Sequence, residues 1–242
     1  MRVAELWRFP VKSMLGERLE AARVTERGMD GDRAYGVRDV ASRQILSARR
    51  VPLLFGFRAR SNGGSVTITL PGETTVLAGD ADVDVQLSAA LGRDVRLTIP
   101  DPGVRARVAD EDGTFRSLEG TFFDAAPIHI VTDATLARLR ELLPGSDLDR
   151  RRFRANVVLE TGAPAGFVED EWIGRRLSVG GAVLHVTKPC SRCVMTTLAQ
   201  DDLPKDREVL RGAIEHNEQH VGVYAKVVQE GEVAVGDVVE VS

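Results

Sequence analysis

Short runs that alternate apolar and polar residues recur along much of the chain, and most of them end at Gly, Asp or Pro. A period of two is typical of strands that bury one face. Clear examples cover residues 65–70, 183–186 and 233–241. Within the last run, Gly236-Asp237 predicts a bend or bulge inside a single strand. The pattern is typical of the half-buried strands of barrels and sandwiches.

Apolar residues at helical spacing predict three helices. One covers residues 84–91 and ends at Gly92, and another covers residues 133–143 with Asp133 as its N-cap. The third covers about residues 206–218, where apolar side chains share one face. The predicted fold class is therefore mainly β with some α.

A change in composition divides the chain. Residues 100–120 are rich in Asp, Glu, Gly and Arg and show little periodicity, which is typical of a long connection. We expect a smaller N-terminal β-rich domain over residues 1–115. A C-terminal β-barrel with helices is expected over residues 116–242.

Composition limits the possible environments. The 242 residues include two cysteines and 28% charged side chains, as expected for a reduced, cytoplasmic globular protein. No segment is apolar enough to span a bilayer, and charges interrupt the N-terminus where a signal peptide would be apolar. The net charge of −4 argues against a protein that neutralises nucleic-acid phosphates. We therefore expect neither a membrane nor a nucleic-acid partner.

The two cysteines, Cys190 and Cys193, stand two residues apart among cationic side chains. Lys188 and Arg192 favour a thiolate, the form that attacks electrophiles and binds soft metals. One cysteine is therefore a candidate metal ligand. The alternative is a pair of packed free thiols without chemistry.

A second cluster runs four arginines into an apolar strand. Arginine presents a planar donor fork suited to phosphate, so the cluster predicts an anion site. Arg154 alternates with apolar neighbours and is expected to point inward, while Asn156 offers donors and an acceptor to the edge of a heterocycle. The alternative is a solvated basic turn. The four arginines are Arg150, Arg151, Arg152 and Arg154.

Three further polar residues follow turns near the N-terminus. Lys12 and Ser13 come after a strand-like opening, and Arg33 comes after a Gly turn. Each alone is typical of a surface position. They become candidates for ligand binding because they occur in the same chain as the cysteine motif.

Together these segments resemble the molybdenum cofactor sulfurase C-terminal (MOSC) superfamily. The matching motifs are FPVKS (residues 9–13), DRAY (32–35), RFRANVVL (152–159), EDEWIG (169–174, with Trp172) and KPCSRCVMTT (188–197). Their order is similar to the branch with an N-terminal MOSC β-barrel domain, which includes the mitochondrial amidoxime-reducing component and bacterial relatives. The resemblance covers nearly the whole chain.

The resemblance implies roles for individual residues. Cys193 would be the molybdenum ligand and the catalytic cysteine, with Cys190 a neighbour. The residues that would contact a molybdopterin cofactor are Lys12, Ser13, Arg33, Arg154 and Asn156. This set agrees with the anion site inferred from charge, since molybdopterin carries a phosphate and a hydrogen-bonding pterin.

Two segments depart from the pattern of that family. Leu198-Ala199 follows the two threonines where relatives often have Val-Asp, and Asp124-Ala125-Ala126-Pro127 stands where relatives commonly have hydroxyl residues before the Pro. These changes affect the expected substrate preference and one set of cofactor hydrogen bonds.

The resemblance implies an oxidoreductase that removes oxygen from N-hydroxylated or N-oxygenated small molecules. Because the sequence has no dinucleotide fingerprint, no phosphate loop and too few cysteines for a ferredoxin-type cluster, electrons would come from a separate flavin or iron–sulfur reductase. An alternative within the superfamily is a carrier of sulfur or of the cofactor. The superfamily also has a nominal association with pyridoxal phosphate binding.

Structural zinc is a further alternative. Cys190 and Cys193 with His216 and His220 have suitable ligand types, and a helix would place both histidines on one side. The interval between the second cysteine and the first histidine exceeds that of a zinc finger. The two other histidines, His129 and His185, are expected to be satisfied core residues. A thioredoxin-like redox pair is disfavoured because the surroundings are rich in strands.

Overall fold

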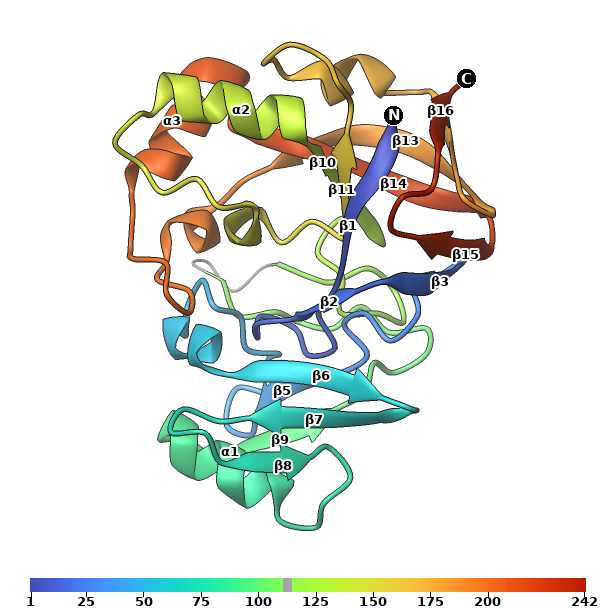
Figure 1. Cartoon of the computed structure of the whole chain (residues 1–242). Coiled ribbons are helices and arrows are strands. Elements are labelled where there is room, and N and C mark those ends of the chain that lie inside the picture. The colour runs from blue at the N-terminus through green and yellow to red at the C-terminus, as the bar shows by residue number, and fades with distance from the viewer. Residues whose placement is uncertain (111–114) are drawn as a thin grey trace. The chain divides into compact units, whose positions relative to one another are not determined.

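The computed structural model describes residues 1–110 and 115–242, which form two compact units (Figure 1). Each unit draws on separated parts of the chain. Unit 1 comprises Met1–Trp7, Arg18–Asp30 and Ala126–Ser242, and unit 2 comprises Arg8–Glu17 and Gly31–Ala125. The division into domains at residues 1–115 and 116–242 stays a prediction.

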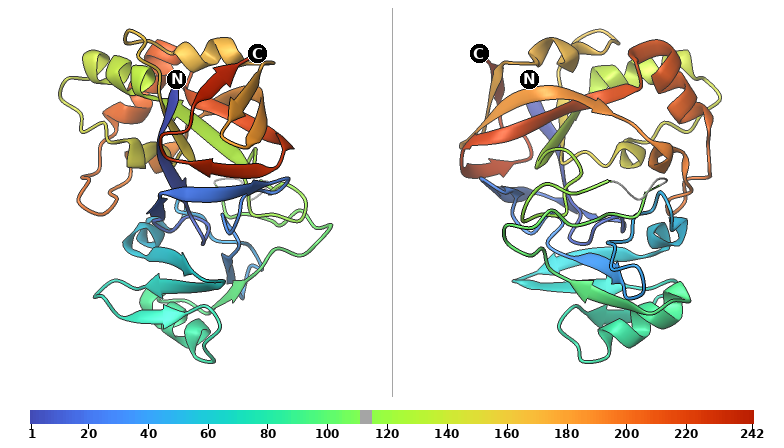
Figure 2. Two further views of the ribbon diagram at one scale, coloured as in Figure 1. Left: turned by 45° about the vertical axis from the view of Figure 1, so that its right-hand side comes forward. Right: turned by 180° about the vertical axis from the view of Figure 1, so that it is seen from behind.

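Unit 1 is built on a mixed sheet of eight strands in the order β16-β12-β13-β14-β10-β11-β1-β2. The long strands β13 and β14 run antiparallel and side by side (Figure 2), whereas β10 and β11 are parallel. The strands are β1 (Arg2–Arg8), β2 (Glu17–Leu19), β10 (Ile128–Thr132), β11 (Val157–Glu160), β12 (Arg176–Val179), β13 (Ala182–Ser191), β14 (His220–Gln229) and β16 (Val239–Val241). A second sheet joins β15 (Gly231–Ala234), β3 (Ala21–Thr25) and β4 (Gly28–Met29).

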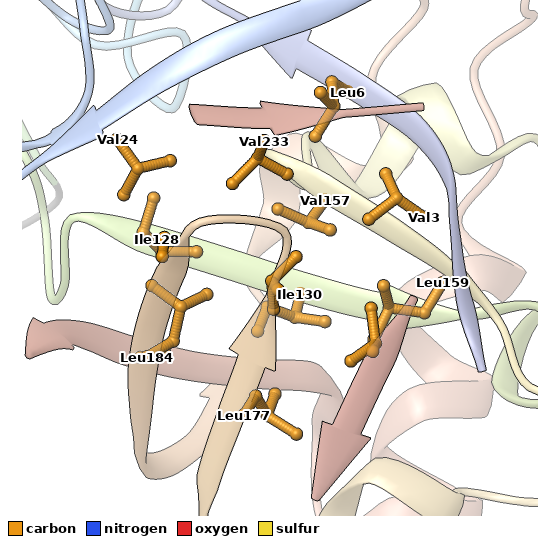
Figure 3. Close-up of a cluster of buried hydrophobic side chains, with 14 of the residues drawn as sticks. Val3, Leu6, Val24, Ile128, Ile130, Val157, Leu159, Leu177, Leu184 and Val233 are labelled. Carbon is orange, nitrogen blue, oxygen red and sulfur yellow. The ribbon is translucent and has the colours of Figure 1, made fainter. Parts of the chain in front are cut away.

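Alternation along the central strands creates two apolar faces. On β10, Ile128 and Ile130 join one buried cluster, whereas Val131 joins another. On β11, Val157 lies in the first cluster (Figure 3) and Val158 in the second. The second cluster also contains apolar side chains of α2 (Asp133–Leu142) and α3 (Glu208–Asn217), so these helices cover one face of the sheet. Period-two burial therefore determines where the helices pack.

The described part of unit 2 contains two small sheets and one α-helix. β5 (Gly36–Asp39) pairs with β9 (Val95–Thr98), and α1 covers Val83–Leu91. The other sheet has the order β6-β7-β8, with bounds Arg58–Asn62, Ser65–Thr69 and Thr75–Leu77. The described residues also form four 3₁₀ helices: η1 (Pro52–Gly56) in unit 2, and η2 (Arg150–Phe153), η3 (Val168–Trp172) and η4 (Val194–Thr197) in unit 1.

The predicted class, mainly β with some α, is confirmed, and so are the three helices. Gly92 ends α1 in a left-handed conformation, as the sequence predicts. Among residues 1–110 and 115–242 no sheet closes into a barrel, and β16 and β2 form the two edges of the large sheet. None of the helices in this part of the chain is long and apolar enough to cross a membrane.

Two local predictions are wrong. Residues 233–241 are not one strand, because Gly236-Asp237 separates β15 from β16 and these strands join different sheets. The N-cap of α2 is Thr132 and not Asp133, since the Thr132 hydroxyl accepts a hydrogen bond from the Thr135 amide. Gly236 has a φ of 93°, which permits the sharp change of direction.

A buried carboxylate anchors the start of α2. Glu169, on η3, is fully buried and accepts hydrogen bonds from the hydroxyls of Thr132 and Thr135, each at 2.6 Å, and from the Thr132 amide. Burial raises the pKa of Glu169, although these donors oppose the rise. The segment 169–174 is therefore attached to the capping residue of α2 through its first side chain.

We expect Glu169→Ala to destabilise the protein by about 2–4 kcal/mol, because it leaves buried donors without an acceptor. Glu169→Gln keeps an acceptor oxygen and should cost far less. Since the folded pKa lies above the ordinary 4.5, the wild type should lose stability as pH rises above that value, and the Gln variant should lose less. Urea unfolding at several pH values measures both effects. Equal pH dependence of the two proteins would contradict the assignment.

Candidate functional site

The two cysteines occupy different environments at the end of β13. Cys190 lies within the strand and is fully buried, whereas Cys193 follows the strand and is half-buried. Cys193 has extended backbone angles and precedes η4. Cys193 is therefore the more accessible of the two sulfur atoms.

Arg192 connects this loop to three other parts of unit 1. Its guanidinium donates to the Cys190 Sγ and to the Phe153 carbonyl at 2.9 Å, and it lies 5.8 Å from the centroid of the Phe153 ring. The Arg192 carbonyl accepts from Gln219 Nε2 at 2.7 Å, and its amide donates to the Gln219 carbonyl. The cysteine loop is thus tied both to η2 and to the turn before β14.

The charge of Arg192 is maintained although the side chain is largely enclosed. Burial lowers the pKa of Arg192, but Cys190, Tyr224 and Cys193 raise it by more, so that its pKa lies above the ordinary value. The Nε atom of Arg192 is buried and has no hydrogen-bond partner among the described residues. A bound acceptor beside the cysteines would satisfy such a donor.

Asn156 crosslinks three strands of the large sheet. Its Oδ1 accepts from the His129 amide at 3.2 Å, and its Nδ2 donates to the Trp7 carbonyl at 3.3 Å. The side chain is almost fully buried. This structural role was missed from the sequence, and the predicted contact of Asn156 with a heterocycle stays a prediction.

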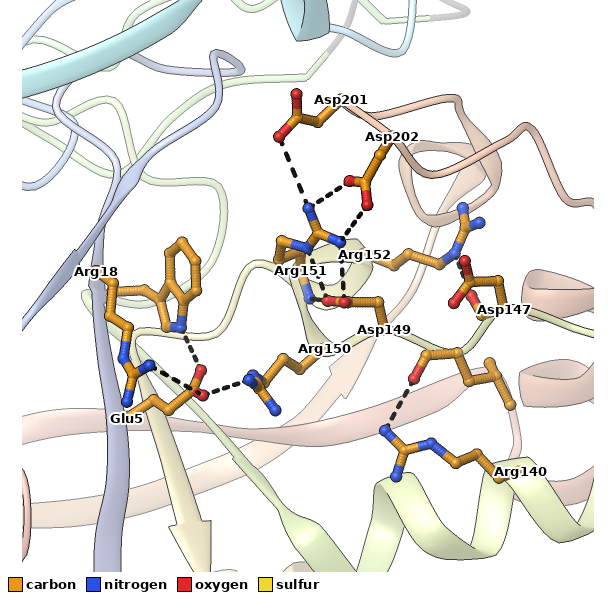
Figure 4. A network of polar contacts seen from close by, with 12 residues as sticks. Glu5, Arg18, Arg140, Asp147, Asp149, Arg150, Arg151, Arg152, Asp201 and Asp202 are labelled. Atoms are coloured by element: carbon orange, nitrogen blue, oxygen red, sulfur yellow. Dashed lines mark hydrogen bonds and ion pairs between the residues drawn. The ribbon is translucent and has the colours of Figure 1, made fainter.

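Arg150, Arg151 and Arg152 have local partners (Figure 4). Arg150 pairs with Glu5, and Arg151 pairs with Asp149, Asp201 and Asp202. Arg152 is fully buried and donates to backbone carbonyls, including those of Asp147 and Pro204. The prediction that all four form one anion site is therefore wrong. The ion pairs and hydrogen bonds of Arg150, Arg151 and Arg152 hold together the loop segments around η2.

The strand-like alternation predicted around Arg154 is absent, because residues 150–153 form the 3₁₀ helix η2 and not the start of a strand. Arg154 follows it with a φ of 54° and is largely buried. Ser13 and Arg33, with φ values of 66° and 49°, share this left-handed conformation. Such angles are uncommon in residues other than Gly and cluster at functional sites. Three predicted cofactor residues thus have an unusual backbone that the sequence did not reveal.

Lys12 belongs to a buried ion-pair cluster in unit 2. Its ammonium donates to the Phe122 carbonyl at 2.8 Å and pairs with the Asp124 carboxylate, which also pairs with Arg49 at 2.7 Å. Burial lowers the pKa of Lys12, and Asp124 offsets only part of this effect. Burial raises the pKa of Asp124, but Lys12 and Arg49 outweigh it and the net shift is downward. Asp124, noted as a departure from the family pattern, is therefore the counter-charge of Lys12.

Arg33 lies beside the same segment. It pairs with the buried Asp32, whose other oxygen accepts from the Phe9 amide at 2.7 Å. The guanidinium lies 4.8 Å from the centroid of the Phe9 ring. The Lys12 amide donates to the Tyr35 carbonyl, so segments 9–13 and 32–35 pair side by side. The structure brings Lys12, Ser13 and Arg33 together within unit 2.

Within unit 1, Arg192 links the cysteine loop to Phe153, the residue before Arg154. Cys193, Arg154 and Asn156 thus belong to neighbouring segments of one unit. The binding of one ligand by both groups of predicted residues stays a prediction.

The histidines fit the zinc alternative poorly. His216 is exposed on α3, whereas His220 begins β14 and is not on the helix as expected. Among the described residues, no three His, Cys, Asp or Glu side chains are grouped so as to hold a metal ion. His129 is buried as predicted, with Nε2 3.1 Å from the Val221 carbonyl. His185 is half-buried and is not the core residue expected.

The difference between the cysteines predicts their reactivity. In metal-free protein, one thiol per chain should react quickly with a small disulfide reagent, and a second should react only after denaturation. Cys193→Ser should abolish the fast reaction and Cys190→Ser should retain it. Absorbance of the released thiol measures both. Fast labelling that persists in Cys193→Ser would contradict this assignment.

A double-mutant cycle tests the pair of Lys12 and Asp124. Asp124→Asn should destabilise the protein by about 3 kcal/mol, because the buried ammonium loses its counter-charge. Adding Lys12→Met should recover much of this loss, since no unpaired charge then remains on Lys12. Urea unfolding gives each free energy. Strictly additive effects of the two substitutions would show that the pair is not coupled.

Comparison with known proteins extends these observations. The MOSC domain model matches residues 117–240, and the MOSC N-terminal beta barrel domain model matches residues 1–102. The mitochondrial amidoxime reducing component 2 of Bos taurus is 26% identical, over 97% of this chain and 81% of its own length. The mitochondrial amidoxime-reducing component 1 of Homo sapiens is 27% identical, over 82% of this chain and 66% of its own.

A solved structure shares the fold at lower identity. The YuaD protein from Bacillus subtilis superposes with a TM-score of 0.54 and 14% identity, over 99% of this chain and 94% of that one. This likeness concerns the fold alone. The family models together match most of the chain, in the order that the sequence motifs predict. The chain therefore belongs to the MOSC domain family and has its N-terminal beta barrel domain.

Proposed function

We propose that this protein is a molybdenum-cofactor-dependent oxidoreductase that reduces N-hydroxylated or N-oxygenated small molecules. The main support is the pair of cysteine environments: Cys193 is accessible beside a cationic Arg192, and Cys190 is buried. The names of the two curated relatives, both amidoxime-reducing components, support the choice of substrate class. Their identity of 26–27% makes the reaction a proposal.

The residues present fit a molybdopterin cofactor. Cys193 offers one thiolate ligand, which suits molybdenum. Among the described residues, the buried Nε of Arg192 has no acceptor, and the ammonium of Lys12 is a buried cation. An anionic group that accepts hydrogen bonds suits donors of this kind.

In this proposal, Cys193 binds the metal and serves as the catalytic cysteine. Lys12, Ser13, Arg33, Arg154 and Asn156 bind the rest of the cofactor. Bound molybdenum supplies two-electron oxygen-atom transfer, which none of the side chains provides.

The protein's own groups bind and orient the ligand. Phe9 packs against the Arg33 guanidinium while Asp32 pairs with it, which fixes the direction of its donors. Arg192 holds Cys190 and the loop so that Cys193 alone faces outward from the end of β13. In this proposal, the left-handed backbone conformations of Ser13, Arg33 and Arg154 set the orientation of these residues before a ligand binds. Hydrogen-bond donors that are already oriented in this way need not reorganise when charge develops on a bound ligand.

The proposal includes a separate electron-donor protein, either a flavin or an iron–sulfur reductase. The natural substrate would be a small molecule with an N–O bond, reduced with two electrons and two protons to the amine-type product and water. A cytoplasmic location stays a prediction.

Metal analysis of purified variants tests the assignment. Wild-type protein should contain close to one molybdenum atom per chain, Cys193→Ala should lose most of it, and Cys190→Ala should retain it. Loss of a single thiolate ligand removes the direct bond to the metal, while the buried Cys190 makes none. Inductively coupled plasma mass spectrometry measures the content. Unchanged molybdenum in Cys193→Ala would overturn the proposal.

Turnover distinguishes a reductase from a carrier. Loaded wild-type protein should reduce an amidoxime with a chemical reductant, and Cys193→Ala should not. A persulfide on Cys193, detected as a mass increase that reductant removes, together with no turnover, would instead favour the sulfur-carrier alternative.

A further inference from the structure

A cavity of about 200 Å³ in unit 2 is lined by five arginines, which we call the arginine pocket. The guanidiniums belong to Arg38, Arg43, Arg105, Arg107 and Arg116. Asp101 is the one carboxylate among the described lining residues. The pocket is thus strongly cationic, although the chain as a whole has a net charge of −4.

The backbone brings these arginines together from separate segments. Arg38 on β5 forms a β-bridge with Ile45, Ile45 forms a parallel bridge with Val108, and Arg107 forms a bridge with Arg116. The Ile45 amide donates to the Arg107 carbonyl at 2.8 Å. Ile45 is fully buried and packs with Val108 in an apolar cluster, so the scaffold of the pocket is fixed by the core.

Internal contacts satisfy few of these charges. Arg38 reaches Asp101 only at 3.5 Å, and Arg105 donates to the Ser117 carbonyl at 3.0 Å. The side chains of Arg43 and Arg107 make no hydrogen bond or ion pair within residues 1–110 and 115–242. Arg43 also has a left-handed φ of 58°, fixed by the turn in which its amide donates to the Asp39 carbonyl.

Grouping cations without counter-charges destabilises a fold unless an anion compensates them. Elsewhere in the chain, clustered arginines have partners, as Arg150 and Arg151 do with Glu5 and Asp149. Guanidiniums from several segments surround an acceptor from different directions. This arrangement suits tetrahedral phosphate groups better than a planar carboxylate, which a single arginine fork binds.

We propose that the arginine pocket binds a small phosphate-bearing molecule with two or more negative charges. The exposed Val104 and the half-buried Pro100 give the pocket apolar lining, so a phosphorylated compound with a small apolar portion fits it. The pocket shares no lining residue with the group of Lys12, Ser13 and Arg33. The proposal therefore does not depend on the molybdenum assignment.

Titration calorimetry of the full chain at low ionic strength tests this site, with inorganic pyrophosphate as the probe. We expect saturable binding of one pyrophosphate at the pocket, at least about tenfold tighter than orthophosphate. Arg107→Gln and Arg43→Gln should each weaken it about tenfold, because each removes a charged donor. Neither side chain has a partner among the described residues, so the thermal unfolding midpoint should hardly change.

Arg60 provides the matched control. It is exposed on β6 in the same unit and lies outside the pocket, so Arg60→Gln should change affinity less than twofold. Lys12→Met should leave pyrophosphate binding intact. Equal losses in Arg60→Gln and Arg107→Gln, or no saturable binding, would overturn the proposal. Citrate binding as tightly as pyrophosphate would contradict the phosphate assignment.

Discussion

The hydrogen bonds of Arg192 are the contacts on which the cysteine site depends. One guanidinium joins the buried Cys190, the carbonyl of Phe153 and the face of its ring, while the backbone of Arg192 is held by Gln219. Because this cation is largely enclosed, its position is set by the few acceptors within reach. Because the Arg192 guanidinium is held in place, the cysteine loop is held as well. The conformation of this loop leaves Cys193 accessible and Cys190 buried. Which of the two sulfur atoms is accessible thus follows from where one charge is buried.

Local compensation of charge organises the rest of both units. Among the described residues no carboxylate pairs with Arg152, which donates to backbone carbonyls instead, and Lys12 is compensated by Asp124. Buried cations need such partners, so most arginines that look like ligand-binding groups in the sequence are structural. The cations that indicate a ligand-binding site are those for which the fold supplies no partner. In the described chain these include the Nε of Arg192 and the side chains of Arg43 and Arg107.

The sequence predicts what short-range patterns control. Alternation located β7 and β13, and helical spacing with a terminal Gly located α1. Alternation could not reveal that residues 150–153 form a 3₁₀ helix, because charged residues in a tight turn and at a strand start look alike. Nor could it assign Asn156 to crosslinking β10 and β1, since those contacts span the sheet. The topology of the sheet determines which residues distant in sequence become hydrogen-bond partners, and the local sequence pattern carries no information on that topology.

Asp124 shows how one departure from a family pattern can be interpreted physically. The Asp124 carboxylate pairs with both Lys12 and Arg49, whereas a hydroxyl would supply no negative charge to either cation. The carboxylate also opposes the effect of burial on the pKa of Lys12 and so favours its charged form. The presence of Asp124 therefore keeps the ammonium charged but offsets part of its attraction for an anion. An anion bound beside Lys12 would meet a permanent positive charge that Asp124 partly compensates.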